Sequence, residues 1–177
     1  MISLTVERAG LADLGRVASG VREFTRLDYA ENFERYLEPD FEAIQQEQFD
    51  SKGARGEAGQ WRPLSPLYAS IKQEFFPGRP IMQLKGRLLG SFTQRGHSDA
   101  LRRVTPTSFE RGSKVPYASV HNAGTDKRMW IPHPFNMWIN GVPKRELIGV
   151  RETDVQRWAD QLGEWVVGDR LPRILGG

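Results

Sequence analysis

The sequence predicts a small α+β domain with amphipathic N-terminal helices, short β-hairpins that form a sheet, and a C-terminal helix. Three observations support this class. Apolar residues near both ends recur at spacings of three and four, the period of a helix packed on one side. The middle holds short strand-like runs separated by Gly, Pro and Asn. With 177 residues, the chain is expected to be a single domain over 1–177.

The N-terminal third is expected to be mainly helical. Residues 2–7 alternate apolar and polar and predict a short strand. A helix over about 10–26 follows, because one stripe contains Leu11, Leu14, Val17, Val21 and Phe24. A second stripe runs over 33–49, and Pro39 is expected to break or kink it. Residues 51–60 contain three glycines and no apolar period, which predicts a mobile loop.

Shorter elements are expected in the middle of the chain. Ser65-Pro66 is typical of an N-cap followed by the first helical residue, and the helix it starts would turn Tyr68, Ile71 and Phe75 inward. A further helix is expected over about 84–93. A hairpin is expected over 101–111, with its turn near Pro106-Thr107, and a helical turn between Pro116 and Gly124.

The segment 126–143 is unusually aromatic and is expected to form a protruding hairpin. Asn140-Gly141 signals a two-residue type I′ turn, because both residues tolerate positive φ. Its large side chains either complete the core or face a protein partner. We favour partner contact, since Trp and Met are frequent interface anchors. The residues concerned are Trp130, Phe135, Met137 and Trp138.

The last helix is expected over about 153–167. Thr153 and Gln156 have capping-box spacing. The buried stripe of this helix is expected to contain Val155, Trp158, Leu162 and Trp165 or Val166.

Charge is unevenly distributed along the chain. The net charge is +3, but residues 1–50 carry 5 Lys/Arg against 11 Asp/Glu, and residues 51–115 carry 12 against 4. Such a chain can pair head to tail with its own copies or turn its basic part toward nucleic acid; alternatively, both regions are solvated faces. Eight cations within the basic part could bind a nucleic-acid backbone: Arg79, Lys85, Arg87, Arg95, Arg102, Arg103, Arg111 and Lys114.

The sequence contains no catalytic signature. There are no cysteines and only three histidines, of which His121 and His133 could share a metal only with a third ligand that the sequence does not indicate. We expect no catalysis, no cofactor, no metal and no small-molecule substrate. No segment resembles a signal peptide or a membrane span, so a cytoplasmic origin and no membrane contact are expected.

Four short motifs occur in order between Trp61 and Gly149. The first contains Trp61, Pro63, Leu64, Ser65, Tyr68 and Lys72. The second contains Leu84, Gly86, Leu88 or Leu89, and Ser91. The third contains Tyr117, Ala118, His121 and Gly124. The fourth is Pro143-Lys-Arg145-Glu-Leu-Ile-Gly149.

Together these motifs resemble those of the phage virion-morphogenesis (tail-completion) family of Mu-like and related tailed phages. The resemblance covers about residues 31–168. Three residues depart from the family pattern: Lys85 stands where threonine is usual, and Lys144 and Glu146 alter the last motif. The last two changes suggest that this junction contacts something different or is more exposed.

The resemblance implies a structural subunit at the head–tail junction, a neck, connector or tail-completion protein, that forms a homo-oligomeric ring. It would be made in the host cytoplasm and dock adjacent neck or tail proteins of the virion around passing DNA. The eight cations of the basic part could line the channel for that DNA. His121 is expected to satisfy the end of its helical turn, and Arg145 to bridge carboxylates or carbonyls at a subunit contact. The main alternative is a sequence-independent nucleic-acid-binding accessory protein that uses the basic region 79–114.

Overall fold

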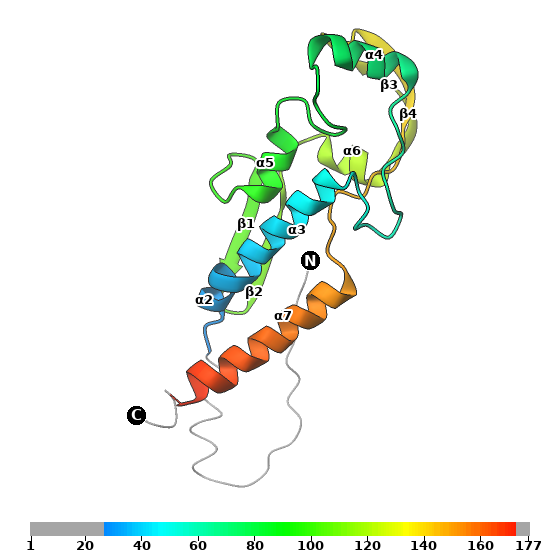
Figure 1. Cartoon of the computed structure of the whole chain (residues 1–177). Helices are drawn as coiled ribbons and strands as arrows, with labels where there is room; N and C mark the ends of the chain where they lie inside the picture. The colour runs from blue at the N-terminus through cyan, green and yellow to red at the C-terminus, as the bar shows by residue number, and fades with distance from the viewer. Residues whose placement is uncertain (1–26, 173–177) are drawn as a thin grey trace. The chain divides into compact units, whose positions relative to one another are not determined.

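The computed structural model describes residues 27–172, which form an α+β fold that ends in a long helix, as the sequence predicts (Figure 1). The expected strand over 2–7 and helix over about 10–26 lie outside the described residues. The chain, expected to be one domain, divides into two compact units. Of the described residues, the first unit comprises 27–40, Arg102–Glu110 and 152–172, and the second Phe41–Leu101 and Arg111–Arg151.

A helix with a widened turn opens the described part. The α-helix α2 (Ala30–Asn32) leads into the π-helix η1 (Phe33–Leu37) and then into α3 (Glu38–Asp50). Pro39 has no N–H to donate and cannot complete the α-helical bond to the preceding turn. In that turn the N–H of Glu38 donates to the carbonyl of Phe33, the π pattern. The expected break at Pro39 is therefore a π-helical turn followed without interruption by α3.

The first unit packs around the C-terminal helix. α7 (Glu152–Trp165) continues into the π-helix η2 (Val166–Arg170), and Leu162, Trp165 and Val166 form a core against Leu27, Tyr29 and Tyr36. Of the stripe predicted for this helix, Trp158, Leu162, Trp165 and Val166 are buried, and Val155 is half-buried. The predicted capping box is wrong: the helix begins at Glu152, so Thr153 lies inside it, and Gln156 donates forward to Asp160.

Two hairpins supply the strands. β1 (Ala100–Thr105) pairs with β2 (Ser108–Ser113), with Pro106 and Thr107 between them as predicted, and β3 (Thr125–Ile131) pairs with β4 (Met137–Val142). Within residues 27–172 each hairpin is a two-stranded sheet of its own, and the two do not join into one sheet.

The predicted Asn-Gly turn of the second hairpin is wrong. Ile131 pairs with Met137, so the turn runs over 132–136, where the N–H of Phe135 donates to the carbonyl of Pro132. Asn140 and Gly141 instead lie within β4, opposite an irregularity in the register between Thr125 and Arg128. Gly141 has the positive φ, +79°, that a type I′ turn would require, but this conformation occurs at the irregularity between β3 and β4.

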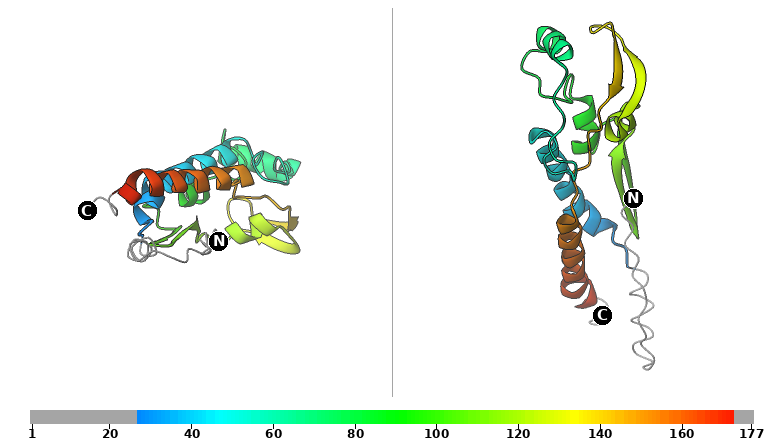
Figure 2. Two further views of the ribbon diagram at one scale, coloured as in Figure 1. Left: turned by 90° about the horizontal axis from the view of Figure 1, so that it is seen from below. Right: turned by 90° about the vertical axis from the view of Figure 1, so that its right-hand side faces the viewer.

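Three short helices complete the second unit. α4 (Pro66–Phe75) starts at Ser65, whose hydroxyl accepts from the N–H of Tyr68 as predicted. α5 (Arg87–Thr93) begins after Gly86, and α6 (Ala118–Ala123) ends at Gly124, both of which have positive φ. The tip of the β3–β4 hairpin bends toward α4 (Figure 2), where the ring of Phe135 stacks on that of Tyr68 at 4.4 Å.

Residues 51–60 form consecutive turns that are tied to other parts of the second unit. The N–H of Arg55 donates to the side chain of Gln48, and its Nε donates to the carbonyl of Gly149. Arg151 donates to the carbonyls of Ala54 and Arg55. The mobility of this segment stays a prediction, and these bonds are what any motion would have to break.

Candidate interaction site

The β3–β4 hairpin carries two exposed tryptophans directly opposite each other. Trp130 pairs with Trp138 in the strand register, and their ring centroids lie 5.6 Å apart at an interplanar angle of 60°. The two side chains are 47% and 54% exposed. The guanidinium carbon of Arg128 lies 4.8 Å from the ring centroid of Trp138, a cation–π arrangement. We call Arg128, Trp130 and Trp138 the aromatic–cationic surface.

The other two expected partner-contact residues of this hairpin lie differently. Phe135 is buried, because its ring stacks on Tyr68 and lies 6.3 Å from that of Phe76. It therefore fixes the turn to α4 and does not face solvent. Met137 is half-buried beside Ile131. Within the expected set, only the tryptophans are exposed.

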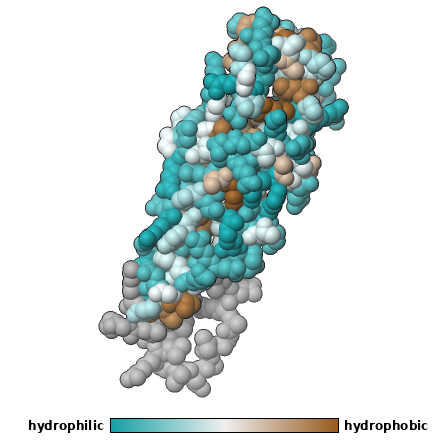
Figure 3. Space-filling view, viewed as in Figure 1, coloured by the Kyte–Doolittle hydropathy of each residue, from teal (hydrophilic) through white to brown (hydrophobic). Residues whose placement is uncertain are grey.

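α4 adds exposed apolar side chains that the sequence did not indicate. Leu67 is 60% exposed, and Phe75, expected to point inward, is 47% exposed. Of seven large hydrophobic residues exposed within the described part, four lie on α4 or the β3–β4 hairpin. Apolar surface gathers over these elements in the space-filling view (Figure 3). Exposed apolar side chains gathered in this way are typical of a protein contact.

Three of the four sequence motifs, the first, third and fourth, meet within the second unit at a cluster that we call the motif junction. Trp61 donates from Nε1 to the carbonyl of Glu146 at 2.9 Å, and its ring meets Phe49 edge-on at 5.2 Å. The side chain of Asn122 accepts from the N–H of Leu147, which is almost fully buried. Residues 61 and 147, far apart in sequence, thus belong to one core. The motif junction comprises Trp61, Arg62, His121, Asn122, Arg145, Glu146 and Leu147.

His121 and Arg145 lie within the motif junction and not on an exposed face. The N–H of Arg145 donates to the carbonyl of His121 at 2.8 Å, and its guanidinium Nη2 donates to the carbonyl of Arg62 at 3.1 Å. The expected bridge to a carbonyl thus exists, but within the chain. The His121 Nδ1 has no hydrogen-bond partner among the described residues, so it does not cap α6. The N–H of Gly124 bonds to the carbonyl of Val120 there instead.

Burial dominates the electrostatics of this cluster. It lowers the pKa of His121 to about 4, with a further contribution from the positive charge of Arg145. Burial also lowers the pKa of Arg145 and raises that of Tyr68, an effect that the charge of Arg145 partly offsets. His121 is consequently neutral at pH 7, which suits a packing residue beside a buried cation.

The departures from the family pattern in the last motif have a structural role. Lys144 and Glu146 form an ion pair at 2.8 Å, and the second carboxylate oxygen of Glu146 accepts from the N–H of Ala58 at 3.1 Å. Lys144, followed by the N–H of Ala58, lowers the pKa of the Glu146 carboxyl. The two residues thereby tie the turns of 51–60 to the motif junction.

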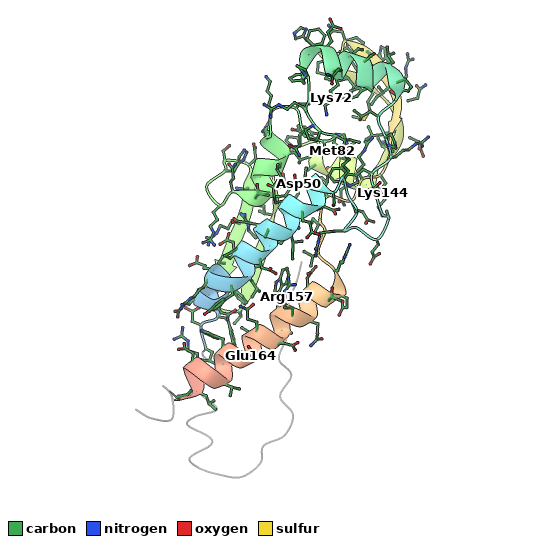
Figure 4. The ribbon with its side chains drawn as sticks, in the orientation of Figure 1. Asp50, Lys72, Met82, Lys144, Arg157 and Glu164 are labelled. Carbon is green, nitrogen blue, oxygen red and sulfur yellow. The ribbon has the colours of Figure 1, made fainter. Side chains whose placement is uncertain are left out.

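Lys72 of the first motif is a buried cation that sequence reasoning left without a role. Its side chain extends from α4 (Figure 4), and its Nζ donates to the carbonyl of Pro80. Burial lowers the pKa of this amine. A lysine at this place joins α4 to the segment that follows it, so the motif residue can be explained by the fold alone.

Half of the cations proposed to line a DNA channel bind acidic side chains of their own unit. Arg102 pairs with Glu34 and Glu38 in the first unit. In the second unit, Glu42 receives Arg111 at 2.9 Å and Arg95 at 3.8 Å, while Arg87 pairs with Asp99. Within residues 27–172, the cations of this set that make no ion pair are Arg79, Lys85, Arg103 and Lys114.

The described residues contain no group suited to metal chemistry. No three His, Asp or Glu side chains in this part of the chain lie close enough to hold a metal ion. A narrow groove in the first unit is lined by apolar side chains such as Phe33, Leu37 and Trp158 and contains no titratable group. In the described part, no helix combines the length and apolar character needed to cross a membrane.

Comparison with known proteins agrees with the motif resemblance. Curated proteins and solved structures give no match to the chain. The Phage virion morphogenesis family matches residues 24–167, which include all four motifs, α4 and both hairpins. That range covers most of the chain, and we conclude that the chain belongs to the phage virion morphogenesis family.

Proposed function

We propose that the protein is a structural subunit at the head–tail junction of a tailed phage or prophage-derived particle. It would act as a neck, connector or tail-completion protein, assembling into a ring around the DNA channel and docking adjacent virion proteins. The family supports a role in building the virion. The exposed Trp130–Trp138 pair carries the docking part of the proposal, because two half-exposed indoles in contact are suited to anchor a partner.

The contacts inside the protein favour docking over catalysis. Three buried ionisable side chains of the described residues have structural partners: Lys72 and Arg145 donate to carbonyls of the second unit, and Glu38 binds Arg102 in the first. Four of the seven large hydrophobic side chains that are exposed within the described residues lie on α4 or the β3–β4 hairpin. The function proposed here accordingly needs no cofactor and no small-molecule substrate.

A complementation experiment tests the docking role. We expect Trp130→Ala/Trp138→Ala to reduce the yield of joined, infectious particles by at least about tenfold, because the loss of two interface anchors weakens docking. Particles would be counted by electron microscopy and plaque assay in a strain that makes only the variant chain. Heads and tails should accumulate unjoined while the purified variant keeps the circular dichroism spectrum of the parent.

The matched control removes exposed apolar side chains elsewhere in the same unit. Tyr117 and Ile148 are 42% and 47% exposed, and neither lies on α4 or the β3–β4 hairpin. Tyr117→Ala/Ile148→Ala should leave the particle yield near that of the parent. A normal yield from the tryptophan variant would overturn the proposed docking role.

The alternative of a nucleic-acid-binding accessory protein has weaker support. Four of the eight basic residues on which it rests are held by Glu34, Glu38, Glu42 and Asp99. Phe92 and Phe109, the two aromatic residues within the basic region 79–114, are buried. Base stacking requires an exposed ring face, and neither ring offers one.

A further inference from the structure

The two compact units carry opposite net charge. Among the described residues, the first unit has 5 Lys/Arg against 11 Asp/Glu, a net charge of −6, and the second has 15 against 8, a net charge of +7. Opposite charge on two parts of one chain allows the part from one copy to attract the other part from a second copy.

In the second unit, the hairpin combines available cations with exposed apolar groups. Lys127 is exposed and makes no ion pair among residues 27–172, and Arg128 interacts with the face of Trp138. Trp130 and Trp138 lie on the same two strands. A partner for this surface should offer carboxylates next to an exposed apolar side chain.

In the first unit, α7 and the turn that continues it offer that combination. Asp160 and Glu164 are exposed and have no cationic partner in the described chain; Glu164 is labelled in Figure 4. Val167, three residues after Glu164, is 65% exposed, the largest value among the exposed large hydrophobic residues of the described part. Residues separated by three or four positions share one side of a helix, so two carboxylates and one apolar side chain lie together.

We propose that the β3–β4 hairpin of one copy docks on the outer face of α7 of a second copy. Arg128, which lies on the same face of the hairpin as Trp130 and Trp138, would face Asp160 and Glu164, with the tryptophans against Val167. Lys127, the preceding residue of β3, would add positive charge at the edge of the contact. The contact joins two different surfaces, so the copy that supplies its hairpin keeps a free α7, and the copy that supplies its α7 keeps a free hairpin. Each can therefore bind a further copy. This inference rests on the proposed docking role of the hairpin and adds the partner: a second copy of the chain.

A charge-reversal pair tests this contact without disturbing the core, since all four side chains are exposed. The hairpin variant is Lys127→Glu/Arg128→Glu, and the helix variant is Asp160→Lys/Glu164→Lys. Each alone places like charges in every contact and should weaken self-association, measured by sedimentation velocity, by about tenfold or more. A mixture of the two restores opposite charges across every mixed contact and should recover association to within about threefold of the parent.

The matched control is Lys85→Glu/Lys114→Glu, which makes the same change in net charge at exposed cations outside the hairpin. It should associate like the parent. If hairpin and helix variants fail separately and also fail when mixed, the proposed pairing is wrong. Equal association of the hairpin variant and this control would also overturn it.

If copies associate only on the particle, the purified protein would not show the contact in solution. The same variants are therefore also expressed, separately and together, in a particle-forming strain. Joined particles should be lost with either variant alone and return when both are made together. If joining is lost with Trp130→Ala/Trp138→Ala but does not return on co-expression of the charge variants, the hairpin docks a different virion protein. That result would overturn the contact between copies and leave the proposed function standing.

Discussion

At the scale of single residues, the motif junction contains a buried cation without an acid. Arg145 is 5% exposed and donates to the carbonyl of Arg62, and its neighbours include His121 and Tyr68. A second positive charge on His121 would have to be buried beside the first. The lowered pKa of His121, about 4, expresses this cost. The motif histidine therefore makes the fold sensitive to acid.

We expect the free energy of unfolding to fall as the pH drops from about 6.5 to about 4. The unfolded chain binds a proton at His121 near its ordinary pKa of 6.5, whereas the folded chain does so only near 4. Over this interval the unfolded state holds more protons and gains stability, by at most about 3 kcal/mol. Urea unfolding followed by circular dichroism at several pH values would measure the slope.

Substitution separates His121 from the carboxylates that titrate at the lower end of this range. His121→Gln should flatten the dependence between pH 6.5 and 5, while His133→Gln, at an exposed position of the hairpin turn, should retain it. An unchanged slope in the His121 variant would show that other groups cause the loss of stability.

At the scale of elements, local signals predicted the right helices and the wrong hairpin turn. Ser65-Pro66 and the stripe of α7 specify their helices because a cap and a 3.6-residue period act over a few residues. The turn predicted at Asn140-Gly141 lies instead at 132–136, where Phe135 stacks on Tyr68, a residue far away in sequence. A register set by such a contact cannot be predicted from neighbouring residues.

The site was predictable only in part for the same reason. The aromatic composition of 126–143 indicated a contact surface, but not which rings would be exposed. Trp138 faces solvent, while Phe135 is buried against α4. The ion pairs of Glu34, Glu38 and Glu42 were also not foreseen. Their spacing of four places these glutamates on one side of the helix, but it does not indicate their partners, which come from residues 95–111.

The hairpin irregularity gives a prediction at this scale. A side chain at Gly141 would place its Cβ 2.6 Å from the carbonyl oxygen of Thr125, in addition to the strain of a φ of +79°. We expect Gly141→Ala to destabilise the hairpin by about 2 kcal/mol or more, from backbone strain and the clash together. Hydrogen exchange of the β3 and β4 amides would measure the loss.

A substitution at Gly59 separates the effect of backbone strain from that of the clash. It has a similar φ of +70°, but no atom lies within 4 Å of the position that a Cβ would occupy there. Gly59→Ala should cost about 1 kcal/mol, from the positive φ alone. Equal effects at the two positions would mean that the strand moves away from the added methyl group and that the irregularity is not fixed by the close approach.

At the scale of the whole molecule, part of the uneven charge of the sequence is paired within each unit. The acidic residues Glu34 and Glu38 bind Arg102 in the first unit, and Glu42 binds Arg111 and Arg95 in the second. Cations held in this way can bind phosphates only by giving up their carboxylates. The basic region therefore offers DNA fewer contacts than its composition suggests.

This reduction predicts a weak and shallow dependence of DNA binding on salt. With four unpaired cations in the set, Arg79, Lys85, Arg103 and Lys114, the slope of log K against log salt should not exceed about 4 in magnitude. Fluorescence anisotropy with a short duplex at several salt concentrations would measure it. Replacing these four residues with glutamine should abolish DNA binding. Particle joining should remain intact, because a channel that DNA must traverse needs only weak contacts with it. A steeper slope in the parent chain, together with tight binding at physiological salt, would mean that the ion pairs open on DNA and would favour a nucleic-acid-binding function.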